Sequence, residues 1–326
     1  MKPYVGGHKV RVNKEVARAW GKLFSDGWPS CCPSDCECSI AKKYGMKSMT
    51  FRFSTSIQNF ADRVAGRHGV YQWSFMKSLF DPTVFVGLYH EGDWSRFILH
   101  RGHKLAFWCG GDILRLKEKP LWQWLIRQVD ADHVCENEVE QKALCEMGIF
   151  ARIHPILFFD PVENFPLSFK PSERPHVWLT CHPGREREYG VELVEEIADK
   201  VPEVTFHIFG IGCAYLAGRY IPYLELRSEV KNIIYHGQVP SEQLDVMIKD
   251  YQCGLRTCEF DGCSHTVTKG ALLGQYPISK ISYPFVDTYN TKEDLIRLLK
   301  DLKKKSRPNI KGRGHWLKVL TNFPWS

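Results

Sequence analysis

Acidic and small polar residues follow an apolar stretch late in the chain, and a helical pattern begins directly after them. Residues 259–264 read Glu-Phe-Asp-Gly-Cys-Ser, between a predicted strand at 253–256 and a predicted helix at 265–273. Open α/β folds bind ligands at the carboxyl ends of their strands, where carboxylates and the free backbone N–H groups of a helix start converge. The sequence therefore predicts a ligand site here, formed by Glu259, Asp261, Gly262, Cys263 and Ser264.

Two arginines lie in an earlier loop of the same kind, between a predicted strand at 176–180 and a predicted helix at 190–201. The guanidinium groups of Arg185 and Arg187 suit a diphosphate, because arginine can donate paired hydrogen bonds to phosphate oxygens and a helix N-terminus adds a favourable dipole. Two arginines in a loop are more often simply solvated, so this loop alone does not establish a phosphate site.

Two further predicted strands end in residues that suit a ligand. Gly210 and Gly212 follow one strand, and glycine lets a ligand approach the backbone. His236 and Gly237 end the next strand, where contacts with the edge of a nucleotide base are expected. Either pair is equally compatible with an ordinary turn.

Titratable residues also follow strands in the first half of the chain. His90, Glu91 and Asp93 come just after one predicted strand, and Asp112 comes after the next. A carboxylate or histidine in a cleft can orient or deprotonate an acceptor hydroxyl, so these four are the candidate catalytic residues. The alternative is that Asp93 is the N-cap of a helix from Trp94 onward and that Asp112 caps the segment that follows it.

The elements that would position these residues alternate between strand and helix in two halves. This alternation predicts an α/β fold of two Rossmann-like domains, with parallel sheets facing a central cleft. A proline-containing linker at 159–173 separates the halves. The predicted strands are 49–53, 83–89, 104–108, 133–135, 152–158, 176–180, 205–209, 233–236, 253–256 and 278–281. The predicted helices are 57–67, 94–100, 120–129, 139–147, 190–201, 241–249, 265–273 and 293–304.

The chain has 12 cysteines, and most are scattered through predicted strands and helices as small buried residues would be. The exception is a cluster formed by Cys31, Cys32, Cys36 and Cys38. A tetrahedral zinc usually takes its ligands from two separated pairs, so a cysteine-rich loop is preferred to a metal site.

Composition and charge are those of a globular protein of 326 residues with room for two domains. The formal net charge is +7, and basic residues crowd both ends of the chain. Such ends favour nucleic acid or an anionic membrane surface, although for a charge this modest a solvated surface is slightly preferred. No apolar run reaches the roughly 20 residues of a membrane span, and the start lacks the apolar stretch of a secretory signal, so a cytoplasmic protein is expected.

Taken in order, the four loops resemble the donor-binding half of GT-B glycosyltransferases, in particular the retaining family four. The resemblance covers roughly residues 175–282. It includes the segment Asn-Ile-Ile-Tyr-His-Gly at 232–237 and Gly-Gln-Tyr-Pro-Ile at 274–278. It implies a nucleotide-sugar donor, of the UDP-sugar type, and no required metal or other cofactor.

One residue departs from the pattern of this family. Lys269 stands where the family has a glutamate that binds the ribose hydroxyls, and an ammonium group cannot accept a hydrogen bond. Either Glu259 or Asp261 replaces that acceptor, or Lys269 meets a phosphate, or the donor differs, or the site is inactive.

The resemblance also implies a division of the chain. Residues 1–47 form a basic, cysteine-rich extension, 48–165 an acceptor-binding domain and 166–290 the donor-binding domain. Residues 291–326 form a C-terminal helix and tail that pack back on the first domain, where Trp316, Phe323 and Trp325 would anchor them.

The predicted function is the transfer of a sugar to an acceptor hydroxyl, with retention and without metal. In a front-face mechanism Arg185, Arg187 and Lys269 would stabilise the leaving diphosphate. The acceptor is either a saccharide or lipid-linked glycan, or a hydroxymethylated pyrimidine in DNA, as in phage DNA modification. A lipid acceptor should be accompanied by an exposed amphipathic segment in the first domain, and the sequence shows no convincing one. The alternatives are an inactive nucleotide- or nucleic-acid-binding protein of the same fold and a nucleotide-sugar epimerase.

Overall fold

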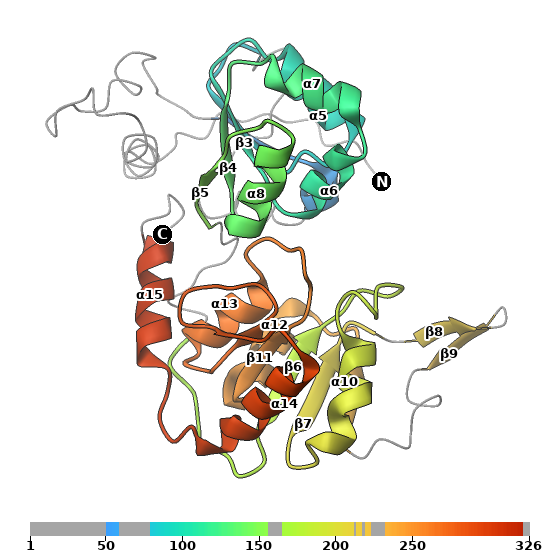
Figure 1. Cartoon of the computed structure of the whole chain (residues 1–326), viewed down its shortest axis with the longest axis vertical. Helices are drawn as coiled ribbons and strands as arrows, with labels where there is room; N and C mark the ends of the chain where they lie inside the picture. The colour runs from blue at the N-terminus through green and yellow to red at the C-terminus, as the bar shows by residue number, and fades with distance from the viewer. Residues whose placement is uncertain are drawn as a thin grey trace, which may run out of the picture. The chain divides into compact units, whose positions relative to one another are not determined.

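The structure is a computed structural model that describes residues 50–58, 79–155, 165–211, 213–216, 219–222 and 232–321. The chain divides into two compact units, each built around a parallel sheet (Figure 1). The first unit comprises Met1–Asp160, Phe260–Cys263 and Val319–Ser326, and the second comprises Pro161–Glu259 and Ser264–Lys318. The cysteine cluster, Gly212, Phe323, Trp325 and most of the helix expected at 57–67 lie outside the described residues.

The first unit contains a five-stranded parallel sheet in the order β1-β2-β3-β4-β5. Its strands are β1 (Thr50–Phe53), β2 (Thr83–Val86), β3 (Lys104–Phe107), β4 (Asp132–Cys135) and β5 (Arg152–Ile153). Every residue of β2 and β3 is buried, as is typical of parallel strands covered on both faces. The predicted strand at 83–89 ends earlier than expected, because Gly87 has a φ of 69° and leaves the extended conformation.

Short helices connect these strands and cover the sheet. They are η1 (Thr55–Ile57), α5 (Glu91–Leu99), α6 (Gly111–Lys117), α7 (Pro120–Arg127) and α8 (Glu138–Glu146). Their apolar sides pack into a core that includes Trp94, Phe97 and Trp108. The sequence did not predict α6, since a helix of 7 residues is too short to show an apolar period.

The second unit contains a six-stranded parallel sheet in the order β10-β7-β6-β11-β12-β13. Its strands are β6 (His176–Thr180), β7 (Thr205–Phe209), β10 (Ile233–Gly237), β11 (Cys253–Arg256), β12 (Ile278–Ser279) and β13 (Asp287–Thr288). Strands β6, β7 and β11 have the predicted bounds, because each is an apolar run between clear breaks. The expected α/β fold with two parallel sheets is confirmed.

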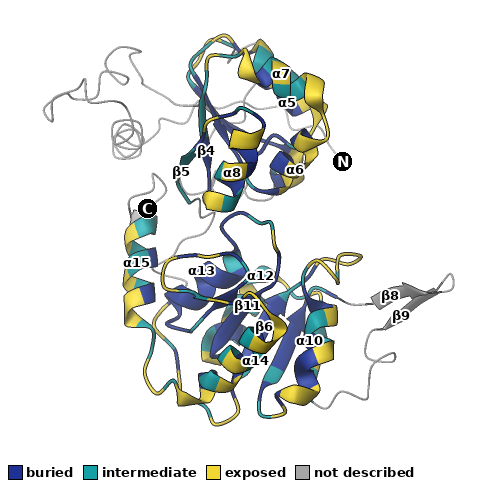
Figure 2. Cartoon of the chain, in the orientation of Figure 1, coloured by how far each residue is buried: buried dark blue, intermediate teal, exposed yellow. Residues whose placement is uncertain are grey.

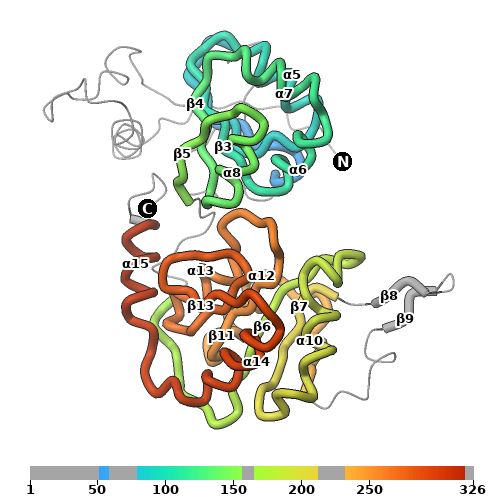
Figure 3. The backbone as a smooth tube through the Cα atoms, in the orientation of Figure 1, coloured from blue at the N-terminus to red at the C-terminus, as the bar shows by residue number. Residues whose placement is uncertain are grey.

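Helices alternate with the strands of the second unit along the backbone (Figure 3). They are α10 (Val191–Ile197), η2 (Ala198–Lys200), α12 (Ser241–Met247), η3 (Ile248–Asp250), α13 (His265–Leu272), α14 (Lys292–Asp301) and η4 (Leu302–Lys304). Strand residues such as Val177 and Phe206 pack with Leu299 of α14 in the core (Figure 2). Thr291 caps α14, since its hydroxyl oxygen accepts a hydrogen bond from Asp294 N at 3.1 Å.

Several elements were not predicted. These are the antiparallel pair β8 (Cys213–Leu216) and β9 (Arg219–Pro222), the short β13 and the helix α15 (Ile310–Thr321). The sequence did not predict α15 because it contains Gly312 and Gly314, and glycine disfavours a helix interior. Trp316 on this helix is buried, and its ring centroid lies 6.3 Å from that of Tyr283 in the second unit.

Within the described ranges, no helix combines the length and the apolar character that crossing a membrane requires.

Candidate functional site

Four loops meet at one edge of the sheet in the second unit. They follow β10, β7, β6 and β11, which are neighbours in this order and run parallel. The carboxyl ends of neighbouring parallel strands lie at the same edge of a sheet, and this edge is where α/β folds bind ligands. The structure thus brings Arg185, Arg187, His236 and Glu259 to the edge that the sequence predicted.

The two arginines of the loop after β6 differ in their partners. Arg185 Nε donates to Glu188 Oε2 at 2.7 Å, and its Nη1 lies 3.3 Å from the hydroxyl of Tyr189. Glu188 raises the pKa of Arg185 above its ordinary value through this pair. The side chain of Arg187 is exposed, and its guanidinium forms no hydrogen bond or ion pair with the residues that the structure describes. Arg187 is therefore the guanidinium available to a ligand without breaking a contact.

A third arginine at this edge was missed by the sequence analysis. Arg256 is the last residue of β11, is largely buried and lies 4.3 Å from the centroid of the Tyr189 ring. Arg185 contacts the same ring at 5.0 Å. A charged residue within the otherwise apolar run Cys-Gly-Leu-Arg was the available signal. Arg185 and Arg256 thus both contact Tyr189, and Arg185 shares its loop with Arg187.

The glycine after β7 allows a close backbone contact. Gly210 has a φ of 94°, and a side chain there would overlap the carbonyl oxygen of Cys181. Its N–H donates to the carbonyl of Gly237 at 2.7 Å, which ties the ends of β7 and β10 together. Close packing of the loops after β6, β7 and β10 therefore requires glycine at position 210, and a ligand contact there stays a prediction.

His236 ends a row of three hydrogen-bonded histidines on β6, β7 and β10. His176 Nδ1 lies 2.8 Å from His207 Nε2, and His207 Nδ1 lies 2.8 Å from His236 Nε2. Burial lowers the pKa of all three, that of His207 to about 3. The row is therefore neutral at pH 7, and His236, whose Nε2 is engaged, has only Nδ1 to offer a ligand.

The acidic loop after β11, at residues 259–264, forms two hydrogen bonds within the first unit. Cys263 N donates to Glu136 Oε2 at 2.8 Å, and Asn137 Nδ2 donates to the carbonyl of Asp261 at 2.7 Å. A side chain at Gly262 would overlap the Glu136 carboxylate, which would then have to move. Glu259 is exposed and forms no hydrogen bond or ion pair with described residues, which leaves its carboxylate able to accept one.

Ser264 and Lys269 belong to the helix that follows this loop. Ser264 is buried at the N-cap of α13, and the first N–H groups of a helix have no partner within it. Lys269 points elsewhere: its Nζ bonds Asp245 Oδ1 of α12 at 2.6 Å and lies 5.4 Å from the Phe165 ring centroid. Its side chain is only 6% exposed. Lys269 therefore belongs to a buried ion pair and is not an exposed ligand for phosphate.

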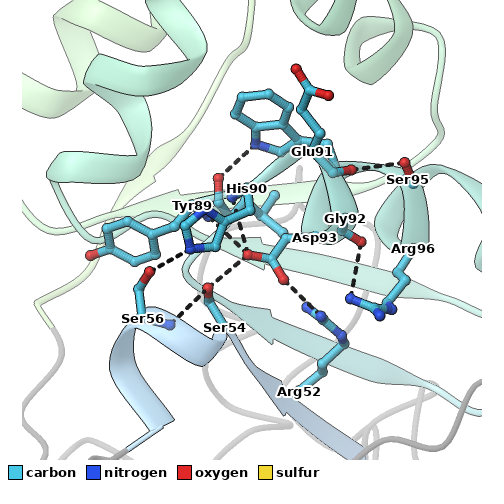
Figure 4. Close-up of polar contacts among 12 residues, drawn as sticks. Arg52, Ser54, Ser56, Tyr89, His90, Glu91, Gly92, Asp93, Ser95 and Arg96 are labelled. Atoms are coloured by element: carbon cyan, nitrogen blue, oxygen red, sulfur yellow. Dashed lines mark hydrogen bonds and ion pairs between the residues drawn. The ribbon is translucent and has the colours of Figure 1, made fainter.

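Two of the four candidate catalytic residues of the first unit are structural. Asp93 forms an ion pair with Arg52 at 2.7 Å and accepts the Ser54 hydroxyl at 2.7 Å (Figure 4). It is the third residue of α5, which begins at Glu91, and it accepts the N–H of His90 at 3.2 Å. Asp93 is thus not the N-cap expected before Trp94, although it does stabilise the helix start.

Asp112 is fully buried and also serves the backbone. Its carboxylate accepts the N–H groups of Leu88, Cys109 and Ile113 at 2.9, 3.0 and 2.9 Å. Burial raises the pKa of Asp112 to about 6 despite these bonds. Burial, and then the charge of Glu136, raise the pKa of neighbouring Glu140 as well. Asp112 accordingly joins the ends of β2 and β3 instead of facing a substrate.

His90 and Glu91 are the two candidates exposed at the start of α5 (Figure 4). Glu91 Oε1 lies 3.3 Å from Lys119 Nζ. His90 Nδ1 lies 3.2 Å from Arg115 Nη1, and His90 Nε2 lies 2.7 Å from Ser56 Oγ. An arginine can only donate, so Nδ1 is the acceptor and Nε2 carries the proton of the neutral ring. His90 therefore presents an N–H on its Ser56 side, and its basic nitrogen is occupied by Arg115.

The described part of the chain contains no group of three or more histidine, cysteine or acidic residues that could hold a metal ion.

Comparisons with solved structures identify the fold. No protein-family model and no curated protein sequence matches the chain. Anabaena HepE in complex with UDP matches with a TM-score of 0.59 and 11% identity, over 87% of this chain and 92% of HepE. The lipopolysaccharide outer core galactosyltransferase WaaB matches with a TM-score of 0.52 and 15% identity, over 82% of this chain and 80% of WaaB.

TarM matches 81% of this chain with a TM-score of 0.50 and 12% identity, and the chain spans 55% of the TarM structure. These neighbours are GT-B glycosyltransferases, and this chain has the GT-B fold. At such identities the likeness establishes the fold alone.

Proposed function

We propose that this protein is a glycosyltransferase that moves a sugar from a UDP-sugar to an acceptor hydroxyl. The observation that carries the proposal is the match to UDP-bound HepE, which extends over nearly the whole of both chains. The gathering of Arg187, His236 and Glu259 at the carboxyl edge of the second unit supports it. The donor binds to residues 166–290 and the acceptor to residues 48–165, while 291–326 form a C-terminal helix and tail.

Arg187 is the residue we assign to the donor diphosphate. Its guanidinium is exposed and has no hydrogen-bond or ion-pair partner among the described residues, and arginine binds phosphate oxygens in a bidentate manner. Arg185 joins it once the diphosphate competes with Glu188 for the guanidinium. The first N–H groups of α13, after Ser264, add further donors to the same anion.

Glu259 replaces the family's ribose-binding glutamate in this proposal. Lys269 stands at that glutamate's position but is buried against Asp245. Its ammonium group also cannot accept hydrogen bonds from the ribose hydroxyls. Glu259 lies at the same sheet edge and carries a carboxylate without a hydrogen-bond partner among described residues. His236 Nδ1 remains available to form a hydrogen bond with the base of the donor nucleotide.

The transfer step follows a front-face course with retention and needs no metal. The bond between the anomeric carbon and the diphosphate oxygen breaks, and the acceptor oxygen bonds to that carbon. The acceptor proton passes to the leaving phosphate oxygen. Arg187 stabilises the charge that develops on the diphosphate, and His90 with Glu91 orients the acceptor.

A saccharide or lipid-linked glycan is the acceptor we favour. WaaB acts on the lipopolysaccharide outer core, and a TarM variant has been crystallised with α-GlcNAc-glycerol and UDP. Both names describe carbohydrate chemistry, and neither involves DNA.

Transfer assays test the proposal. Purified protein is incubated with each of several UDP-sugars and with simple glycosides, lipid-linked glycans or hydroxymethylated duplex DNA, and products are identified by mass spectrometry and NMR. A glycoside product with the donor's anomeric configuration supports the proposal. A product from DNA would overturn the choice of acceptor, an inverted product would overturn the front-face course, and an epimerised donor without transfer would overturn the transferase.

A further inference from the structure

Helix α7 of the first unit is apolar on two opposite faces. Its inner face packs Ile126 and Trp122 into the core of the unit. On its outer face Leu121 is 65% exposed and Trp124 is 51% exposed, and the two residues lie one helical turn apart. A helix on the surface of a soluble protein normally carries polar residues there, so two large apolar side chains on this face call for a partner.

Exposed basic residues are frequent on α7 and on the helix before it. The exposed residues of α6 and α7 and of the turn between them include four cations and one acid: Arg115, Lys117, Lys119, Arg127 and Glu118. Lys117 pairs with Glu146 at 3.4 Å and Lys119 with Glu91 at 3.3 Å, but all four groups are about half exposed. Exposed pairs of this kind are weak and exchange readily for another anion. Leu114 on α6 is a further exposed apolar residue in this region.

We propose that α6 and α7 form a docking surface for an anionic lipid bilayer, here named the α7 face and comprising Leu114, Leu121, Trp124, Arg115, Lys117, Lys119 and Arg127. Leucine and tryptophan beside lysine and arginine are the composition of helices that lie in the membrane interface, where tryptophan is enriched. The cations meet lipid phosphates while the apolar side chains enter the headgroup region.

The chemistry of the α7 face favours a bilayer over the other polyanion expected from the sequence. Nucleic acid would attract the four cations, but its phosphate backbone offers nothing apolar to Leu121 and Trp124. A bilayer satisfies both halves of the surface. A lipid acceptor is expected to be accompanied by an exposed amphipathic segment in the first unit, and α7 supplies one. The helix was predicted, but which of its faces packs inward was not.

Vesicle cosedimentation tests the proposal with the full chain. Wild-type protein is expected to bind phosphatidylglycerol-containing vesicles and to bind phosphatidylcholine vesicles weakly. The double variant Leu121→Glu/Trp124→Glu should bind the anionic vesicles at least tenfold more weakly, because it loses apolar burial and gains repulsion. Lys117→Gln/Lys119→Gln should weaken binding several-fold at low salt and less at high salt.

Val246→Glu is the matched control, since Val246 is 64% exposed on α12 of the second unit. It should leave vesicle binding unchanged. Circular dichroism checks that each variant is folded. Equal binding by wild type and the double variant would overturn the proposal, and so would an absence of binding by wild type.

Fluorescence quenching provides a second measurement that does not depend on a disruptive variant. Brominated lipids should quench part of the tryptophan emission of the wild type, and Trp124→Phe should lose that part while still binding. If Trp124→Phe is quenched like the wild type, Trp124 does not enter the bilayer and the proposal fails. A dimer that dissociates in the double variant, without vesicle binding by either protein, would assign the α7 face to a second copy instead. Because vesicle binding needs no donor, either failure leaves the transferase proposal intact.

Discussion

Asp112 illustrates at the scale of a residue why a candidate site needs more than a residue type. Its position after a strand suggested a catalytic carboxylate, yet all of its recorded hydrogen bonds come from backbone N–H groups and it is fully buried. No pattern in the sequence indicates which strand ends enclose Asp112. Exposed neighbours such as His90 remain candidate catalytic residues because the turn after β2 leaves them at the surface.

Asp112→Asn should destabilise the fold without any direct effect on chemistry. The amide would place an N–H group against the N–H of Leu88, Cys109 or Ile113, so one buried donor loses its acceptor. The expected loss is about 1–3 kcal/mol of unfolding free energy, measured by urea denaturation. Glu91→Gln is the control, since an exposed substitution should stay within about 0.5 kcal/mol. An Asp112→Asn protein of full stability but without activity would restore Asp112 as a catalytic residue.

The pair formed by Lys269 and Asp245 gives a second prediction at this scale. Asp245→Asn leaves a buried ammonium without its carboxylate and should lower the unfolding free energy by about 3–5 kcal/mol. The double variant Lys269→Met/Asp245→Leu should lose much less, because it buries no charge. Denaturation of the two variants measures the difference. Equal losses would mean that the ion pair does not hold α12 against α13.

At the scale of elements, strands were predicted better than their ends. The runs that became β7 and β11 are apolar and sharply bounded, and their limits were predicted correctly. The glycines after β7 were predicted to let a ligand approach, but the sequence did not predict that Gly210 packs against Cys181. Contacts between loops that are distant in sequence leave no periodic signal, and neither do short or glycine-containing helices such as α6 and α15.

Gly210→Ala tests the closure of these loops. Both a φ of 94° and overlap with the Cys181 carbonyl oppose a side chain, so a loss of several kcal/mol is expected from strain and displaced backbone. Gly184→Ala is the matched control, because Gly184 has a φ of 80° but nothing within 4 Å of the added carbon. It should lose only about 1 kcal/mol. Thermal unfolding of both variants separates close packing from backbone strain, and equal losses would contradict the packing.

At the scale of the whole molecule, buried neutral histidines should make stability depend on pH. Burial lowers the pKa of His207 to about 3 and that of His100 to about 4. The unfolded chain therefore takes up protons first, and stability present above about pH 6.5 is lost as the pH falls toward these values. At pH 5 the expected loss is about 2 kcal/mol for each histidine. The raised pKa of Asp112 has the opposite effect. As the pH falls from 7 to 5, it adds back about 1 kcal/mol of unfolding free energy.

Urea denaturation at pH 7 and pH 5 measures this dependence. His207→Gln keeps a hydrogen-bonding amide but removes the titration, so its loss of stability between the two pH values should be about 2 kcal/mol smaller. An unchanged pH dependence in this variant would show that His207 does not remain neutral in the folded state.

The central proposal, a nucleotide-sugar site at the carboxyl edge of the second unit, is tested most directly by isothermal titration of UDP-sugars into the purified protein. Wild type should bind at least one UDP-sugar, and Arg187→Ala should bind it at least tenfold more weakly because a charge-assisted contact with the diphosphate is lost. Arg174→Ala, which removes another exposed arginine of the same unit, should bind like the wild type. Binding that ignores Arg187 would contradict the assigned site, and an absence of heat with every nucleotide sugar would contradict the proposed function itself.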